Sequence, residues 1–100
     1  MLRRSPYSKV IDAQLEVFLR EHCEVFEEAQ RRLDLYNRAD RSEAEELYGD
    51  YVDAVETGTD ILSDMRDHYS ATLAEPDDYV SAFNRAVAKR LPEFAERDIG

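Results

Sequence analysis

The sequence predicts an all-α protein: a long antiparallel helical hairpin with a shorter third helix, assembling as a helical-bundle dimer. Apolar residues recur at a spacing close to 3.6 through two long segments, as they do on one face of a helix. Only three Gly and three Pro occur in 100 residues, too few for the turns of a sheet-rich fold. A chain of this length fits a single domain, residues 1–100.

The first helix is expected over about residues 6–38. Ser5 is a suitable N-cap, and Pro6 suits the first helical position because its missing N–H has no partner there anyway. The apolar stripe of this helix consists of Tyr7, Ile11, Leu15, Phe18, His22, Phe26, Ala29, Leu33 and Tyr36.

The second helix is expected over about residues 42–74. Ser42 and Glu45 form a capping box, which restarts the chain as a helix directly after the turn. The stripe consists of Ala44, Tyr48, Tyr51, Val55, Gly58, Leu62, Met65, Tyr69 and Thr72. The opposite column is acidic throughout, which marks the side that faces solvent: Glu46, Asp53, Asp60 and Asp67.

The third helix is expected over about residues 77–91. Pro76 suits its first turn, and Asp77 and Asp78 favour the positive end of the helix dipole. Pro92 interrupts or kinks it, because proline removes a backbone hydrogen bond and clashes with the preceding turn.

The short turn near residue 40 predicts that the two long helices pair antiparallel, with facing residue numbers adding to about 80. This register places His22 opposite Gly58. The same reasoning at Pro76 brings Phe94 level with Gly58, so the third helix covers only the half of the hairpin that lies away from the turn.

The other half of the hairpin is left with a surface of large apolar and tyrosine side chains, which is typical of an association site. These side chains include Leu33, Tyr36, Leu47, Tyr48, Tyr51 and Val52. We expect a homodimer in which two hairpins form a four-helix bundle. The alternative is a helical protein partner of a different sequence.

A glycine in mid-helix needs a reason, because Gly58 costs about 1 kcal/mol relative to alanine. We expect it to make room for the His22 imidazole or for the rings of Phe18 and Phe26, with Thr59 as a hydroxyl partner. A ligand-binding or general-base role of His22 is the alternative. No inward carboxylate is predicted beside it, which favours a structural buried polar pocket.

Asp60, Asp64 and His68 lie at four-residue spacing and are candidate ligands for a divalent metal. The Glu-x-x-His pairs of bundle di-metal sites do not occur in the sequence. Since Asp60 also belongs to the acidic column, we favour a solvated acidic face.

The charge excludes some classes of partner. The chain has 23 acidic and 13 basic residues and a formal charge of −10, without the basic stripe that nucleic acids or anionic membranes require.

No run approaches the roughly 20 apolar residues of a membrane span. The single Cys23 excludes an internal disulfide and a cysteine zinc site. We expect a cytoplasmic protein with no cofactor.

The functional expectation is a non-enzymatic protein-interaction or regulatory helical module, acidic and soluble. The alternative is a helical-bundle protein that binds a ligand or metal, with or without catalysis. Its site would lie around His22 and Gly58 or around Asp64 and His68.

Overall fold

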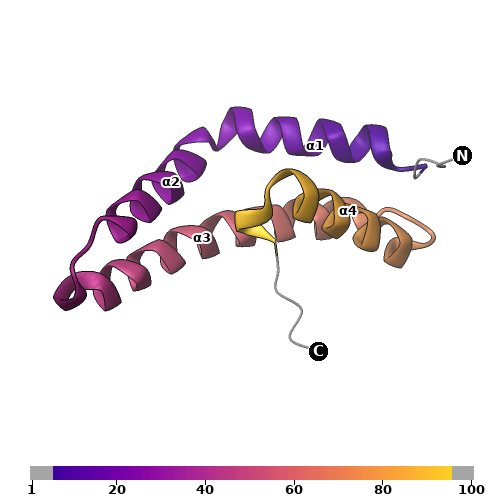
Figure 1. Cartoon of the computed structure of the whole chain (residues 1–100). Helices are drawn as coiled ribbons and strands as arrows, with labels where there is room; N and C mark the ends of the chain where they lie inside the picture. The colour runs from indigo at the N-terminus through magenta and orange to yellow at the C-terminus, as the bar shows by residue number, and fades with distance from the viewer. Residues whose placement is uncertain (1–5, 96–100) are drawn as a thin grey trace, which may run out of the picture.

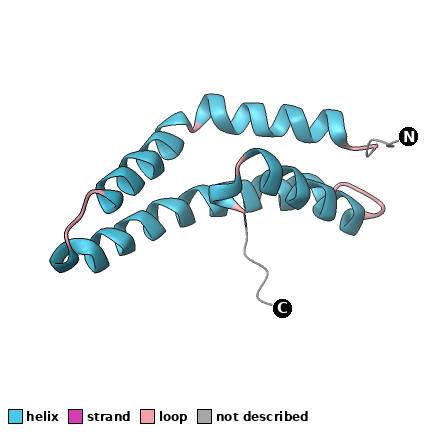
Figure 2. Cartoon of the chain, viewed as in Figure 1, coloured by secondary structure: helices cyan, strands magenta, loops and turns pink. Residues whose placement is uncertain are grey.

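The computed structural model describes residues 6–95, and all regular secondary structure in that range is helical, as the sequence predicts. The elements in chain order are α1 (Ser8–Glu21), α2 (Cys23–Asn37), α3 (Arg41–Ser70), α4 (Pro76–Arg90) and the short 3-10 helix η1 (Pro92–Phe94). Figure 2 shows that short loops join them.

The helices lie along an elongated molecule. α1 and α2 follow one another along one side, and α3 returns beside α2 (Figure 1). α4 folds back along the second half of α3 and also contacts α1 (Figure 1). The extents are 51 × 31 × 28 Å and the radius of gyration is 15.6 Å. A compact domain of 100 residues has a radius of gyration of about 13 Å, so this molecule is more elongated than a compact domain of its length.

The first predicted helix is in fact two helices. The chain breaks at His22, whose backbone angles (φ −127°, ψ 34°) lie outside the helical range. The Phe94 ring lies at the junction, with its centroid 5.7 Å from that of Phe18 in α1 and 6.2 Å from that of Phe26 in α2. The prediction of one helix over 6–38 is therefore wrong, because apolar spacing follows a buried face and does not register a bend in it.

Asp40, and not Ser42, caps the start of α3. Its carboxylate accepts hydrogen bonds from the Ser42 hydroxyl at 2.7 Å and the Glu43 backbone N–H at 3.2 Å. Both bonds favour the charged form, so they hold the pKa of Asp40 below its usual value. The expected capping box of Ser42 and Glu45 is corrected to an Asp40 cap with Ser42 as a second donor.

The end of α3 comes at Ser70, four residues before the expected end at residue 74. The Ser70 hydroxyl donates to the Asp67 carbonyl at 3.1 Å, and the Thr72 hydroxyl donates to the Tyr69 carbonyl at 2.7 Å. The same two carbonyls also accept the backbone N–H groups of Ala71 and Thr72, and the bond from Thr72 spans only three residues, so the helix tightens as it ends.

The remaining boundaries follow the proline and cap signals. Pro76 is the first residue of α4, and Pro92 ends the helical run and opens η1, which confirms the interruption predicted there. α1 begins at Ser8 rather than at residue 6. The expected N-cap, Ser5, lies outside the described residues.

The core is concentrated at one end of the molecule. We call residues 8–21 and 58–94 the base, and residues 23–57, which comprise α2 and the first half of α3, the tip. Ten apolar side chains are buried in the base: Ile11, Leu15, Phe18, Leu62, Tyr79, Ala82, Phe83, Val87, Leu91 and Phe94. In the tip the one buried apolar side chain is Ala29. Three layers of helix thus enclose a core in the base, whereas the tip consists of two helices.

Tyr79 places a polar hydroxyl in the core of the base, where burial without a hydrogen bond is unfavourable. Its ring packs between those of Tyr7, Tyr69 and Phe83, with centroid distances of 5.4, 4.9 and 5.9 Å. The side chain is fully buried, and among the described residues its hydroxyl has no hydrogen-bond partner. Burial disfavours the phenolate and raises the pKa of Tyr79 to about 12.

Candidate functional site

The candidate site is a surface of the tip, which we call the tip patch. It consists of Leu33 and Tyr36 on α2 and of Leu47, Tyr48, Tyr51 and Val52 on α3. Tyr48 is 48% exposed and the other five side chains are half-buried. The rings form a short chain: the Tyr36 and Tyr48 centroids are 5.2 Å apart and those of Tyr48 and Tyr51 are 6.3 Å apart.

Helical spacing explains the continuity of the tip patch. Tyr48 lies four residues from Val52 and three from Tyr51, so their side chains are neighbours on the surface of α3. Of the expected residues, the three tyrosines come together through their ring contacts. Tyrosine suits such a surface because its ring is apolar while its hydroxyl can stay in water.

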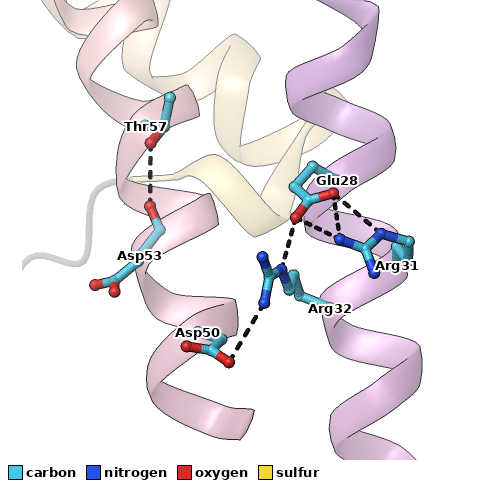
Figure 3. A network of polar contacts seen from close by, with 6 residues as sticks. All are labelled: Glu28, Arg31, Arg32, Asp50, Asp53 and Thr57. Carbon is cyan, nitrogen blue, oxygen red and sulfur yellow. Dashed lines mark hydrogen bonds and ion pairs between the residues drawn. The ribbon is translucent and has the colours of Figure 1, made fainter.

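One ion pair of a small network of charged side chains joins the two helices of the tip (Figure 3). The Arg32 guanidinium on α2 lies 2.6 Å from Glu28 of its own helix and 3.3 Å from the Asp50 carboxylate on α3. Arg31 binds the same Glu28 carboxylate at 2.8 Å. The hydrogen bonds from Arg32 and then Arg31 lower the pKa of Glu28, and the bond to Glu28 raises the pKa of Arg32.

Gly58 makes room for Phe94, not for His22. A Cβ atom at Gly58 would lie only 2.6 Å from Cδ1 of the Phe94 ring and closer still to Cε1. The Thr59 hydroxyl donates to the backbone carbonyl of Phe94 at 3.1 Å. The expectation that Gly58 and Thr59 serve the imidazole is thus corrected, whereas the expectation that Phe94 comes level with Gly58 is confirmed.

His22 is half-buried at the break between α1 and α2. Its ring stacks at a tilt near Phe18, with centroids 5.8 Å apart, and its backbone N–H donates to the Phe18 carbonyl at 2.8 Å. His22 therefore ends one helix and starts the next. The Phe94 ring therefore fills the space beside Gly58 in which the imidazole was expected.

The proposed metal ligands remain on the surface. Asp60, Asp64 and His68 are all exposed, and within residues 6–95 no three His, Cys, Asp or Glu side chains converge as metal ligands do. Asp64 and His68 line a hollow together with Gln14 of α1, while Asp60 lies outside it. Asp60, Asp64 and His68 follow one another along the helix surface, but their side chains do not surround one position that a metal ion could occupy.

A hollow of about 400 Å³ lies between α3, α4 and η1 in the base. It is lined by Thr59, Leu62, Ser63, Arg66, Phe83, Asn84, Val87, Ala88, Phe94 and Ala95. Arg66 donates to the Asn84 amide oxygen at 3.0 Å and to Asp67 at 2.8 Å. The bond to Asn84 joins α3 to α4, so Arg66 is part of the packing between these helices.

Two contacts between distant segments were not anticipated from the sequence. The Gln30 amide on α2 donates to the Glu93 carboxylate of η1 at 2.8 Å, and Arg90 at the end of α4 pairs with Asp12 of α1 at 3.2 Å. The contact at Gln30 shows which edge of α2 faces the end of the α4–η1 segment. Periodicity signals neither contact, because it separates buried faces from exposed ones but does not say which exposed side chains pair.

In the described part of the chain, no helix is long and apolar enough to cross a lipid bilayer. Comparison with protein-family models, curated proteins and solved structures found no match to this chain.

Proposed function

We propose that this protein is a non-enzymatic interaction module that binds another helical protein surface through the tip patch. The observation that carries the proposal is the difference in burial between the two ends of the molecule. Residues 58–94 and α1 enclose a core of ten buried apolar side chains, whereas residues 23–57 bury Ala29 alone. Helices with one apolar face are stable when another layer covers that face.

The tip patch has the composition of an interface. Tyrosine is enriched at the centres of protein interfaces, where its ring fills a pocket and its hydroxyl finds a partner. Half of the tip patch is tyrosine, and its three rings contact one another. A partner that covers them removes apolar surface from water, which stabilises the complex by about 25 cal/mol for each Å² buried.

Two kinds of occupant can complete the bundle at the tip. A second copy can contribute its own α2 and α3, giving the four-helix homodimer that the sequence predicts. A different protein can contribute a helix. Both place apolar side chains on the tip patch, so both require the same residues of this chain.

The proposal is tested by measuring association of the full chain. Sedimentation velocity detects a second copy, and native mass spectrometry of the protein purified from its source detects a different chain. We expect one of these complexes, and we expect Tyr51→Glu and Leu47→Glu to abolish it by burying a charge. Ser81→Glu, at an exposed position on α4, is the matched control and leaves the complex intact.

A wild-type chain that stays monomeric and alone in both measurements contradicts the proposal. A complex that survives Tyr51→Glu and Leu47→Glu contradicts it equally, because association would then use another surface.

A further inference from the structure

The tip patch lies where the third layer of the molecule stops. α4 and η1 run along α3 as far as Phe94, whose ring packs on Gly58. Beyond that point α3 continues over residues 41–57 beside α2, and within residues 6–95 no further helix lies against them (Figure 1). At 1.5 Å per residue this stretch is about 25 Å long. A helix of some 17 residues would extend the line of α4 and η1 to the end of the molecule.

Two observations show which face of the tip continues the surface on which η1 packs. The bond between Gln30 and Glu93 shows that this edge of α2 faces η1. On α3, Thr59 faces the backbone of Phe94, and Val52 and Tyr48 lie on the same face seven and eleven residues before it. The tip patch is therefore continuous with the surface on which η1 packs.

The borders of the tip patch are acidic. Glu45 lies three residues before Tyr48 and Glu56 lies four residues after Val52, so both flank the tip patch on α3. On α2, Glu27 lies three residues before Gln30 and shares its edge. All three carboxylates are exposed, and none has an ion pair among the described residues.

The excess of negative charge is specific to the tip. Residues 23–57 contain eleven acidic and four basic side chains, so they hold −7 of the total formal charge of −10. Three of the four arginines are bound to acids of the tip itself: Arg31 and Arg32 to Glu28, Arg32 also to Asp50, and Arg38 to Asp34. Eight carboxylates of the tip have no ion pair within the described residues: Glu24, Glu27, Asp40, Glu43, Glu45, Glu46, Asp53 and Glu56.

We infer that the occupant of the tip patch is a basic amphipathic helix of another protein, a deepening that rests on the proposed function. Its apolar face covers the tyrosines, and its lysines and arginines meet the acidic borders. A symmetric dimer applies the same surface to itself, so it would bring two tips of charge −7 together. Like charges facing each other oppose association, whereas opposite charges speed it and select the partner.

The test uses the full chain and two designed 17-residue helical peptides with the same apolar face of Leu and Phe. One carries Lys and Arg at its polar positions and the other carries Glu. Affinities are measured by fluorescence anisotropy at two salt concentrations. We expect the basic peptide to bind at least tenfold more tightly than the acidic one, and to weaken severalfold as salt rises, because salt screens surface charges.

Variants of this chain locate the binding. Glu45→Gln with Glu56→Gln removes two border charges without changing the fold, and we expect severalfold weaker binding of the basic peptide. Asp60→Asn with Asp64→Asn removes the same charge from exposed positions of the base and leaves the affinity unchanged. Tyr51→Glu abolishes binding of the peptide altogether.

The outcomes separate this inference from the proposed function. If both peptides bind equally well and Tyr51→Glu abolishes that binding, the inference of a basic partner is overturned, whereas the proposed interaction module stands. The inference of a basic partner is likewise overturned, and the interaction module stands, if the protein is a homodimer that binds neither peptide and dissociates on Tyr51→Glu. Basic-peptide binding that ignores both Tyr51→Glu and the border variant is non-specific and overturns the inference. A monomer that binds neither peptide overturns the inference, and the proposed function then rests on its own test with the purified native protein.

Discussion

The base and the tip are built from the same kind of amphipathic helix, and α3 runs through both, yet only the base encloses a core. Ten buried apolar side chains lie in the base, and the tip is joined by the ion pair of Arg32 with Asp50 and by contacts among tyrosines. Surface ion pairs of this kind contribute little to stability. The difference shows that an apolar stripe predicts a helix but does not ensure that the same chain covers it.

The boundary between the two regions is built from a few residues. Phe94 packs against Gly58 of α3 and lies near Phe18 of α1 and Phe26 of α2, at the point where the chain bends at His22. The third layer ends there because Leu91 leaves the helix before Pro92. The Phe94 ring therefore lies where the chain bends and where the third layer ends.

The largest expected effect is the loss of this ring. Phe94 is 1% exposed, and replacing a buried Phe by Ala costs about 3–5 kcal/mol in the free energy of unfolding. Leu33→Ala in the half-buried tip should cost clearly less, because its site already opens to water. Urea unfolding of Phe94→Ala and Leu33→Ala compares the two regions directly. Equal losses at the two sites would mean that the tip is as well packed as the base.

The two helical glycines of α3 should respond to alanine with opposite signs. Gly49 has no atom within 4 Å of a new Cβ, so Gly49→Ala should stabilise the tip by up to about 1 kcal/mol through helix propensity alone. At Gly58 the new Cβ meets the buried Phe94 ring, and overpacking of this kind costs about 1–3 kcal/mol. Thermal unfolding of Gly58→Ala and Gly49→Ala tests this. Stabilisation by both substitutions would show that Phe94 does not rest on Gly58.

Tyr79→Phe should stabilise the base. The ring contacts with Tyr7, Tyr69 and Phe83 are kept, and a buried hydroxyl that lacks a partner among the described residues is removed. We expect a gain of about 1 kcal/mol, since an unsatisfied buried polar group costs about that much or more. Urea unfolding measures it. A destabilised Tyr79→Phe would show that the hydroxyl is hydrogen-bonded, for instance to a buried water.

The smallest effect is the pH dependence of the Asp40 cap in the tip. The pKa of Asp40 is lower in the folded protein than in the unfolded chain, so its contribution is present above the unfolded pKa and is lost as the pH falls through the folded pKa. The stability difference between wild type and Asp40→Asn should be constant near neutral pH and should shrink on acidification. Urea midpoints across the acid range check this. A difference that does not change with pH would mean that Asp40 is not held by Ser42 and Glu43.

The sequence predicts the helices of this protein better than their interruptions. Periodicity found each helical segment, and Pro76 and Pro92 marked the limits of α4 correctly. The break at His22 was missed because it has no proline or glycine and arises from the packing of Phe94 between helices that are distant in sequence. Asp40 was missed as the cap because Ser42 and Glu45 form an equally good local signal.

The sequence predicts which apolar and tyrosine side chains make up the tip patch, but it does not predict the ion pairs around it. The residues of the tip patch follow from helical spacing and from the position of Pro92, which limits how far the third layer reaches. The pair between Arg32 and Asp50 lies two residues away from the expected register, since facing positions on wet surfaces are set by side-chain reach. Gly58 was correctly identified as a gap, but its occupant comes from a segment 36 residues further along the chain.

Hydrogen–deuterium exchange of the free full chain tests the contrast between base and tip most directly, because exchange reports local opening. Amides of α4 and of residues 58–70 should exchange slowly, and those of α2 and residues 41–57 should exchange much faster. Addition of the basic helical peptide should slow exchange in the tip and leave the base unchanged. Uniform protection of both regions in the free protein would contradict this account, because a tip that is complete by itself has no need of a partner.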